Sequence, residues 1–155
     1  MDFRTLITTM TDAACRGDGS AVAACFTPDG VYHDCFYGSF RGAAIKDMVE
    51  HFFHRDATAF LWDIHEPVAH GDTGYARYVF SFESKLPEAL GRRAIFEGVS
   101  ICKLRDGLIQ SYREVANSAA GLATLGFAPD RLAKILDREA KALMSRDEAK
   151  LHCPR

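Results

Sequence analysis

The order in which the hydrophobic pattern changes along the chain most constrains its fold. Apolar residues recur at helical spacing over residues 3–16 and 43–54, whereas strand-like runs dominate residues 59–115. The strand-like runs follow one another with only short turns between them, and no helix alternates with them. Helices followed by consecutive strands are typical of an α+β fold, with an antiparallel sheet that carries its helices on one face.

The predicted strands are rich in β-branched and aromatic residues and are bounded by turn residues. The last two form a hairpin around Arg105-Asp106-Gly107, because an Asp-Gly pair between two apolar runs is a strong turn signal. Pro28-Asp29-Gly30 is also a turn signal, and Gly38 and Gly42 bracket a predicted loop. We therefore expect strands over residues 31–36, 59–68, 75–83, 94–104 and 108–115.

The chain of 155 residues is most simply one domain with a substantial hydrophobic core. The helix-then-sheet pattern spans residues 1–117. Residues 118–155 begin with an apolar, glycine-punctuated stretch, and a helix then starts at Pro129, where a first-turn amide has no partner and proline is tolerated. One side of this helix is apolar and must be buried, so we expect residues 118–155 to be a helical extension packed on the same domain.

Charge and motif content exclude several classes of function. The net charge of −2, with scattered basic residues, argues against a nucleic-acid surface. No signal-peptide core and no run of about 18 apolar residues is present, so we expect a cytoplasmic protein without a membrane span. The five cysteines are unpatterned, and His51 and His54 fall off the apolar stripe of their helix, on a solvated face. No disulfide framework, metal site or cofactor is therefore predicted.

Asp34 is the first candidate for a functional residue. In the strand over residues 31–36, Tyr32, Asp34 and Phe36 share one face, so a carboxylate stands between two aromatic rings. A carboxylate on an apolar face either titrates abnormally or is neutralised by a partner. The alternative is that Asp34 lies near a sheet edge, solvated or bonded to nearby backbone amides.

The chain resembles the nuclear transport factor two-like superfamily, especially its SnoaL-like and ketosteroid-isomerase-like branches, over residues 3–117. The resemblance is carried by FTPDGVYHD (26–34), by Gly42 before a helix, by FEGVSICKLRDGLIQSYREV (96–115) and by an N-terminal helix that ends in RGD. It implies a cone-shaped, strongly curved antiparallel sheet wrapped around the N-terminal helices, the cystatin-like fold. It also implies a pocket at the open end and frequently a homodimer through the outer face of the sheet.

The ketosteroid-isomerase pattern carries over at one position. Asp34 stands where that family has the carboxylate that shuttles a proton on a carbon next to a carbonyl. The family's tyrosine donor is here Met10, and its second acidic donor is here Ser100. Because the donors that would stabilise an enolate are absent, the resemblance does not imply steroid isomerisation itself.

Glu114 is a candidate for a second carboxylate in the same pocket. SnoaL-like cyclases place an acidic residue at about this location, and Glu114 should share its inward face with Tyr112 and Ala116. Two carboxylates in one dry pocket would push each other's pKa apart and provide one acid and one base. The alternative is that Glu114 pairs with Arg113 or Arg77 on the surface.

The resemblance further implies a hydrophobic pocket wall, although plain core packing is the alternative for the aromatic residues. The catalytic candidates are Asp34, Glu114 and Tyr112, and the ligand-contacting candidates are Met10, Tyr32, Phe36, Trp62, Tyr78, Phe80, Phe82 and Ser100.

Three functions remain open at this point. The first is a cofactor-free isomerase, lyase or cyclase that acts on a small apolar or aromatic carbonyl or hydroxyl compound, with Asp34 as the base. The second is a noncatalytic binder of such a molecule, and the third is a dimerisation module in which the extension docks on a neighbour or caps the cone.

Overall fold

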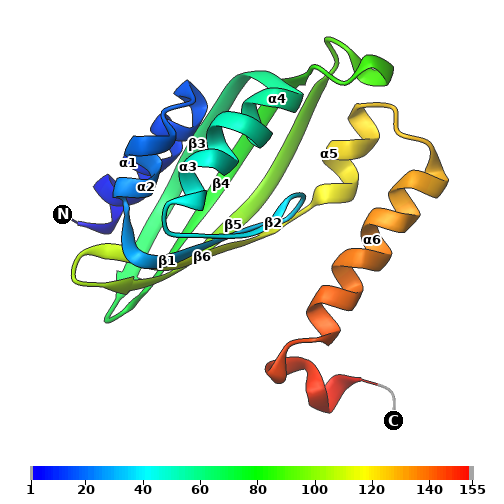
Figure 1. Cartoon of the computed structure of the whole chain (residues 1–155). Coiled ribbons are helices and arrows are strands. Elements are labelled where there is room, and N and C mark those ends of the chain that lie inside the picture. The colour runs from blue at the N-terminus through cyan, green and yellow to red at the C-terminus, as the bar shows by residue number, and fades with distance from the viewer. Residues whose placement is uncertain (1, 154–155) are drawn as a thin grey trace.

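A curved six-stranded sheet wraps around the N-terminal helices (Figure 1). The computed structural model describes residues 2–153. The strands lie in the order β2-β1-β6-β5-β4-β3. With its C-terminal helix, this arrangement confirms the predicted α+β fold. The strands are β1 (Phe26–Asp34), β2 (Gly38–Arg41), β3 (Ala57–His70), β4 (Thr73–Ser84), β5 (Arg93–Arg105) and β6 (Leu108–Ala116).

One strand pairing differs from the predicted antiparallel sheet. β1 and β6 run parallel, whereas the other neighbouring strands are antiparallel. β1 and β6 are separated by most of the chain, so no tight turn forces them into an antiparallel pair. The sheet is therefore mixed.

β1 begins at Phe26, five residues before the strand start expected at residue 31. The Pro28-Asp29-Gly30 segment is not a turn between elements. It lies inside the strand, where the register against β6 shifts between Phe26 and Val31. An irregularity of this kind bends a strand without ending it, so the turn residues mark a bend in β1.

β2 occupies residues that the sequence predicts to be a loop. It forms a hairpin with β1, in which Asp34 pairs with Gly38. The backbone amides of Phe36 and Tyr37 both donate to the side chain of Asp34 and close the turn. Side-chain bonding to nearby backbone leaves no trace in the hydrophobic periodicity, which is why the hairpin was not predicted.

β3 is an edge strand that runs through Pro67 to His70, beyond its predicted end. Proline cannot donate to the ladder but is tolerated at edges and bulges. The register against β4 shifts near Pro67 and again near Ala59, and Ala59 and Glu66 have φ of 50° and 51°. Because bulges increase local twist and bend, these two positions favour the curvature of the sheet.

The first two helices, α1 (Phe3–Arg16) and α2 (Gly19–Ala24), begin at aspartate caps. Asp2 Oδ1 accepts from the Thr5 amide and Asp18 Oδ1 from the Ala21 amide, each at 2.9 Å, which satisfies amides of the first turn. α1 packs along β3, on the side of the inner face away from α5 (Figure 1). Its buried apolar residues are Leu6, Ile7, Met10, Ala13 and Ala14.

The helix predicted over residues 43–54 is observed in three consecutive segments. α3 (Ala44–Asp47) continues into a π-helical segment (Met48–Phe53) and then into α4 (His54–Asp56). Nε2 of His54 lies 2.7 Å from the carbonyl oxygen of Ala14, at the end of α1. His54 is therefore half-buried between two helices, and its expected place on a solvated face was wrong.

The extension contains α5 (Ser118–Thr124), α6 (Pro129–Met144) and a short 3₁₀ helix (Asp147–His152). α5 packs against β5, and α6 begins at its proline as predicted. Leu132 and Ile135 of α6 pack against the core, whereas Leu136 and Leu143 are exposed. Residues 154 and 155 of the predicted extension lie outside the described residues. Across residues 2–153, no helix combines the length and apolarity that a membrane span needs.

Gly121 is the point at which α5 makes its closest approach to the sheet. A Cβ at Gly121 would overlap the ring of Phe96 on the inner face of β5. We expect Gly121→Ala to lower the free energy of unfolding by about 1–3 kcal/mol because it overpacks this contact. Helix propensity alone predicts the opposite, a gain of up to about 1 kcal/mol. Urea unfolding monitored by circular dichroism measures the change.

The matched control is Ala120→Gly, on the exposed side of the same helix. It changes helix propensity without touching the sheet and should cost about 0.5–1 kcal/mol. A Gly121→Ala protein as stable as the wild type would show that this contact does not hold α5.

Candidate functional site

A cavity of about 240 Å³ opens between the inner face of the sheet and the C-terminal extension. Its polar lining residues are Asp34, Cys35, Asp56, Glu114 and Arg131. The rest of the wall is apolar and mostly aromatic, so the few polar groups face a poorly hydrated space. The aromatic lining residues are Tyr32, Phe36, Tyr37, Phe53, Trp62, Tyr78, Phe80, Phe82, Phe96 and Phe127.

Six of the eight residues predicted to contact a ligand line this cavity. The period of two along β3 and β4 turns their aromatic side chains to the inner face. β1 and the turn that follows it contribute the others. The six residues are Tyr32, Phe36, Trp62, Tyr78, Phe80 and Phe82.

Three predicted site residues do not line the cavity. Met10 is fully buried on the inward side of α1, in the packed part of the core. The hydroxyl of Tyr112 lies 3.1 Å from Oγ of Ser100, and its ring packs on Tyr32 with 4.6 Å between centroids. Tyr112 and Ser100 thus satisfy each other behind the cavity wall. The alternation of side chains along a strand correctly predicted that Ser100 and Tyr112 face inward. It did not predict how far along the strand the cavity begins.

Asp34 lies at the end of β1 and faces the cavity. Its Oδ1 accepts hydrogen bonds from the backbone amides of Phe36 and Tyr37, both at 2.8 Å. Asp34 therefore combines the two environments considered from the sequence, an apolar surrounding and hydrogen bonds from nearby backbone amides. Burial raises the pKa of Asp34 above its ordinary value, and the two amides oppose that shift because they stabilise the anion.

Glu114, on β6, faces the same cavity. The hydroxyl of Tyr78 donates to Oε2 of Glu114. Gly98, on the strand between them, leaves room for this contact, since a Cβ there would collide with the Tyr78 hydroxyl. Within residues 2–153, Glu114 forms no ion pair with Arg113 or Arg77, and Arg77 pairs with other glutamates on the outer face. The alternative of a surface ion pair for Glu114 is therefore not observed.

The two carboxyl groups differ in how well each is stabilised as an anion. Burial, and then the nearby charge of Asp34, raise the pKa of Glu114 to about 8, while the Tyr78 hydrogen bond opposes the shift. Glu114 therefore holds its proton at neutral pH. Asp34 keeps two amide donors on one oxygen, so the negative charge of the pair resides there. Burial and the charge of Glu114 also raise the pKa of Tyr78, which keeps its hydroxyl a donor.

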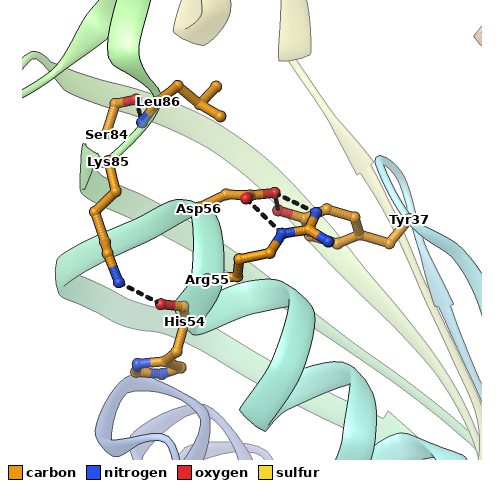
Figure 2. Close-up of polar contacts among 7 residues, drawn as sticks. All are labelled: Tyr37, His54, Arg55, Asp56, Ser84, Lys85 and Leu86. Atoms are coloured by element: carbon orange, nitrogen blue, oxygen red, sulfur yellow. Dashed lines mark hydrogen bonds and ion pairs between the residues drawn. The ribbon is translucent and has the colours of Figure 1, made fainter.

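A second polar cluster includes Tyr37 and Asp56, which line the cavity, and Figure 2 shows its contacts. The Tyr37 hydroxyl donates to Oδ2 of Asp56 at 2.9 Å, and Arg55 donates to both Asp56 oxygens at 2.7 and 2.8 Å. Lys85 Nζ donates to the carbonyl oxygen of His54 at 2.9 Å and ties the β4–β5 connection to α4. The Arg55 hydrogen bonds hold the pKa of Asp56 below its usual range. Asp56 is thus an anion compensated by its own neighbour.

The C-terminal extension supplies part of the cavity wall. The guanidinium of Arg131 lies over the ring of Phe127, 3.7 Å from its centroid, and reaches Oε1 of Glu88 at 2.5 Å. This contact joins the start of α6 to the β4–β5 connection at the mouth of the cavity. The remaining wall residues of the extension are Leu122, Leu125 and Ile135.

Several lining residues were not predicted from the sequence. Phe96 alternates correctly with the inner face of β5, so the period of two could have identified it. Cys35 and Tyr37 lie in the turn after β1, and Phe53 ends the π-helical segment, where no simple period applies. Burial raises the pKa of the Cys35 thiol, which stays neutral. Among the described residues, no three His, Cys, Asp or Glu side chains are grouped to hold a metal ion.

Comparison with known proteins identifies related sequences and folds. Residues 7–112 match the family of SnoaL-like domains. No curated protein sequence is significantly similar to the chain. Many solved structures share the fold, and the family and these structures together confirm the resemblance on which the predicted fold was based.

Three of these structures illustrate the likeness. A Catenulispora acidiphila protein with a ketosteroid isomerase-like fold, solved with trimethylamine, is 19% identical over 81% of this chain and 95% of its own, with a TM-score of 0.71. IdmH from Streptomyces antibioticus, provisionally assigned as a polyketide cyclase, is 20% identical over 80% and 98%, with a TM-score of 0.66. An M. tuberculosis LEH-like epoxide hydrolase is 17% identical over 78% and 86%, with a TM-score of 0.64. At these identities the likeness establishes the fold alone.

Replacement of Glu114 tests the buried carboxyl pair. Because its pKa rises from 4.5 to about 8 on folding, Glu114 keeps its proton in the folded state while the unfolded chain loses it. Its contribution to stability is complete below pH ~4.5 and is lost as the pH rises towards about 8. At about 1.4 kcal/mol per pKa unit, we expect the wild type to lose up to roughly 4–5 kcal/mol relative to Glu114→Gln across this range.

Urea unfolding of both proteins at a series of pH values measures this difference. Glu97→Gln, at an exposed glutamate of the outer face, is the control and should leave the pH profile nearly unchanged. Parallel profiles for the wild type and Glu114→Gln would contradict a buried, proton-bearing Glu114.

Proposed function

The chain belongs to the family of SnoaL-like domains, and we propose that its cavity binds a small apolar or aromatic molecule on which Asp34 and Glu114 perform cofactor-free acid–base chemistry. The reacting group is a carbonyl or hydroxyl function, and the reaction is an isomerisation, a lyase step or a cyclisation. The observation that carries this proposal is a pair of carboxyl groups in one aromatic cavity, of which Asp34 accepts from two backbone amides and Glu114 accepts from the Tyr78 hydroxyl.

Asp34 is the general base in this proposal. It is the carboxyl whose anion is stabilised by backbone amides, yet burial makes that anion more basic than an exposed aspartate. An aspartate of this kind can remove a proton from a carbon next to a carbonyl group. The amides also fix the side chain, so Oδ2 is held in a defined direction for the proton transfer.

Glu114 is the matching acid. At neutral pH it carries a proton that it can share with the substrate oxygen on which negative charge develops. The Tyr78 hydroxyl orients Glu114 and acts as a positioning group. The apolar wall lowers the local polarity, which strengthens each of these electrostatic interactions. Glu114 thus replaces the donors that are absent at Met10 and Ser100.

The similar structures support a small-molecule role without selecting a reaction. One was solved with trimethylamine, and two others carry the names of different reactions, a polyketide cyclase and an epoxide hydrolase. The choice among isomerase, lyase and cyclase therefore depends on the substrate. Noncatalytic binding in the same cavity is the alternative, and a ligand recovered unchanged would support it.

Asp34→Asn tests the proposed base. As a probe we choose the ring opening of 5-nitrobenzisoxazole, because removal of one carbon-bound proton by a carboxylate in an apolar site drives that reaction. We expect the wild type to accelerate it, and Asp34→Asn to lose about 10²–10⁴-fold of the rate. Absorbance of the nitrophenolate product measures the rate.

Asp63→Asn, on the opposite face of the sheet, is the matched control and should keep the wild-type rate. Near-ultraviolet circular dichroism checks that both variants fold. An Asp34→Asn protein with undiminished rate would contradict the role of Asp34, as would a wild-type rate equal to that of free acetate.

We also propose that two copies of the chain pair through the outer face of the sheet. Val99 and Val115 lie opposite each other on β5 and β6 and are 37% and 58% exposed, and Leu61 and Ile95 are also exposed. Exposed apolar side chains that gather on a sheet face, here around the Arg77–Glu97 ion pair, can form a protein interface. Because the same patch would occur on both copies, a two-fold pairing can bury it.

Sedimentation velocity tests this pairing. We expect the wild type to sediment as a dimer and Val115→Lys to shift it to monomer, because a lysine there would be buried without a partner. Leu151→Lys, a change of the same type at a residue that is 95% exposed, should leave the dimer intact. A monomeric wild type at tens of micromolar would overturn the proposal.

A further inference from the structure

Acidic and basic groups are unequal in number along the cavity wall. Asp34, Asp56 and Glu114 line it, and Arg131 is the single Lys or Arg among its lining residues within the described chain. Asp56 is neutralised by Arg55, and Arg131 is paired with Glu88 at the mouth. Asp34 and Glu114 also border a wider groove that is lined by Arg113, Arg138 and Arg146. Within residues 2–153 neither carboxyl forms an ion pair with any of these arginines, so no protein cation compensates the pair directly.

Each of these two carboxyl groups also has an oxygen without a protein donor. Asp34 accepts both of its hydrogen bonds at Oδ1, and Glu114 accepts from Tyr78 at Oε2. Within residues 2–153, no side chain or amide donates to Asp34 Oδ2 or to Glu114 Oε1, and neither oxygen is enclosed by protein atoms. Both oxygens are thus available to a positively charged or hydrogen-donating ligand.

The wall next to the carboxyl groups consists of aromatic rings packed against one another. Phe80 and Phe82 lie 6.2 and 5.9 Å from Phe96 between ring centroids, and Trp62 lies 4.8 Å from Phe80. Where a ring of this wall presents a face to the cavity, it attracts a cation by about 0.5–2 kcal/mol per contact. The wall and the carboxyl groups therefore favour the same sign of ligand charge.

From this geometry we propose that the cavity is selective for a small alkylammonium ion over neutral and anionic molecules of the same shape. The ligand's charge would lie near the free oxygens of Asp34 and Glu114, and its apolar substituents against the rings. The volume of about 240 Å³ is below the roughly 300–1,000 Å³ of sites for drug-sized ligands, so the ion is small. This inference rests on the proposed binding role of the cavity, and not on the proton-transfer step.

The test compares three molecules of one shape: choline, its neutral isostere 3,3-dimethylbutanol, and the anion 3,3-dimethylbutanoate. Isothermal titration calorimetry on the full chain measures each affinity. We expect choline to bind at least about tenfold more tightly than 3,3-dimethylbutanol, a difference of about 1.4 kcal/mol, and 3,3-dimethylbutanoate to bind most weakly.

Two variants locate the selectivity. Asp34→Asn and Glu114→Gln should each weaken choline binding by about tenfold and reduce the ratio of choline to 3,3-dimethylbutanol affinity, while Asp63→Asn should change neither affinity. A neutral isostere that binds the wild type as tightly as choline overturns the inference, and so does the absence of choline binding.

If the wild type opens 5-nitrobenzisoxazole but does not prefer choline, the inference fails and the proposed function stands. If the wild type prefers choline but Asp34→Asn opens 5-nitrobenzisoxazole at the wild-type rate, the inference stands and the proposed base is wrong.

Discussion

The inner face of the curved sheet has to be covered along its whole length, and the N-terminal helices cover only part of it. α1 packs along β3 and fills the region around Met10, while α5 packs against β5 through Gly121. The cavity lies where the aromatic inner face meets the extension. The cavity therefore forms because the sheet is curved and because the N-terminal helices and the C-terminal extension cover separate parts of it. The residues of its wall belong to elements that are distant in sequence.

This construction explains why two carboxyl groups can persist in an apolar interior. Asp34 lies at the end of β1, where the turn to β2 offers it two backbone amides, and Glu114 lies where Gly98 gives the Tyr78 hydroxyl access. Each carboxyl is thus partly stabilised by local geometry and partly destabilised by burial. The folded protein keeps the pair because one member retains a proton and avoids the cost of two buried charges.

Local patterns predicted the face of each strand, and long-range docking determined the rest of the site. Trp62 and Tyr78 were predicted on the wall from the family resemblance, and the alternation of side chains along a strand is consistent with that placement. Tyr112 was misplaced because the same alternation does not say how far along the cone a residue lies. Arg131 and Phe127 could not be predicted, since no local pattern says where a helical extension folds back. The antiparallel expectation failed at β1 and β6 for the same reason, because that pairing joins distant segments.

Basicity and cation binding are both consequences of the desolvation of the pair, and they oppose each other at any one carboxylate. A cation beside Asp34 would stabilise its anion and reduce its ability to accept a proton. A cation stabilises the anion of Glu114 more than that of Asp34, because Glu114 accepts from one hydroxyl whereas Asp34 already accepts from two amides. Binding there would displace the proton of Glu114 and let the positive charge of the ligand take over the electrostatic role of that proton. Asp34 would remain the base for an amine whose reacting carbon lies towards it, whereas Glu114 would act as a counter-ion for that ligand and as an acid only for neutral substrates.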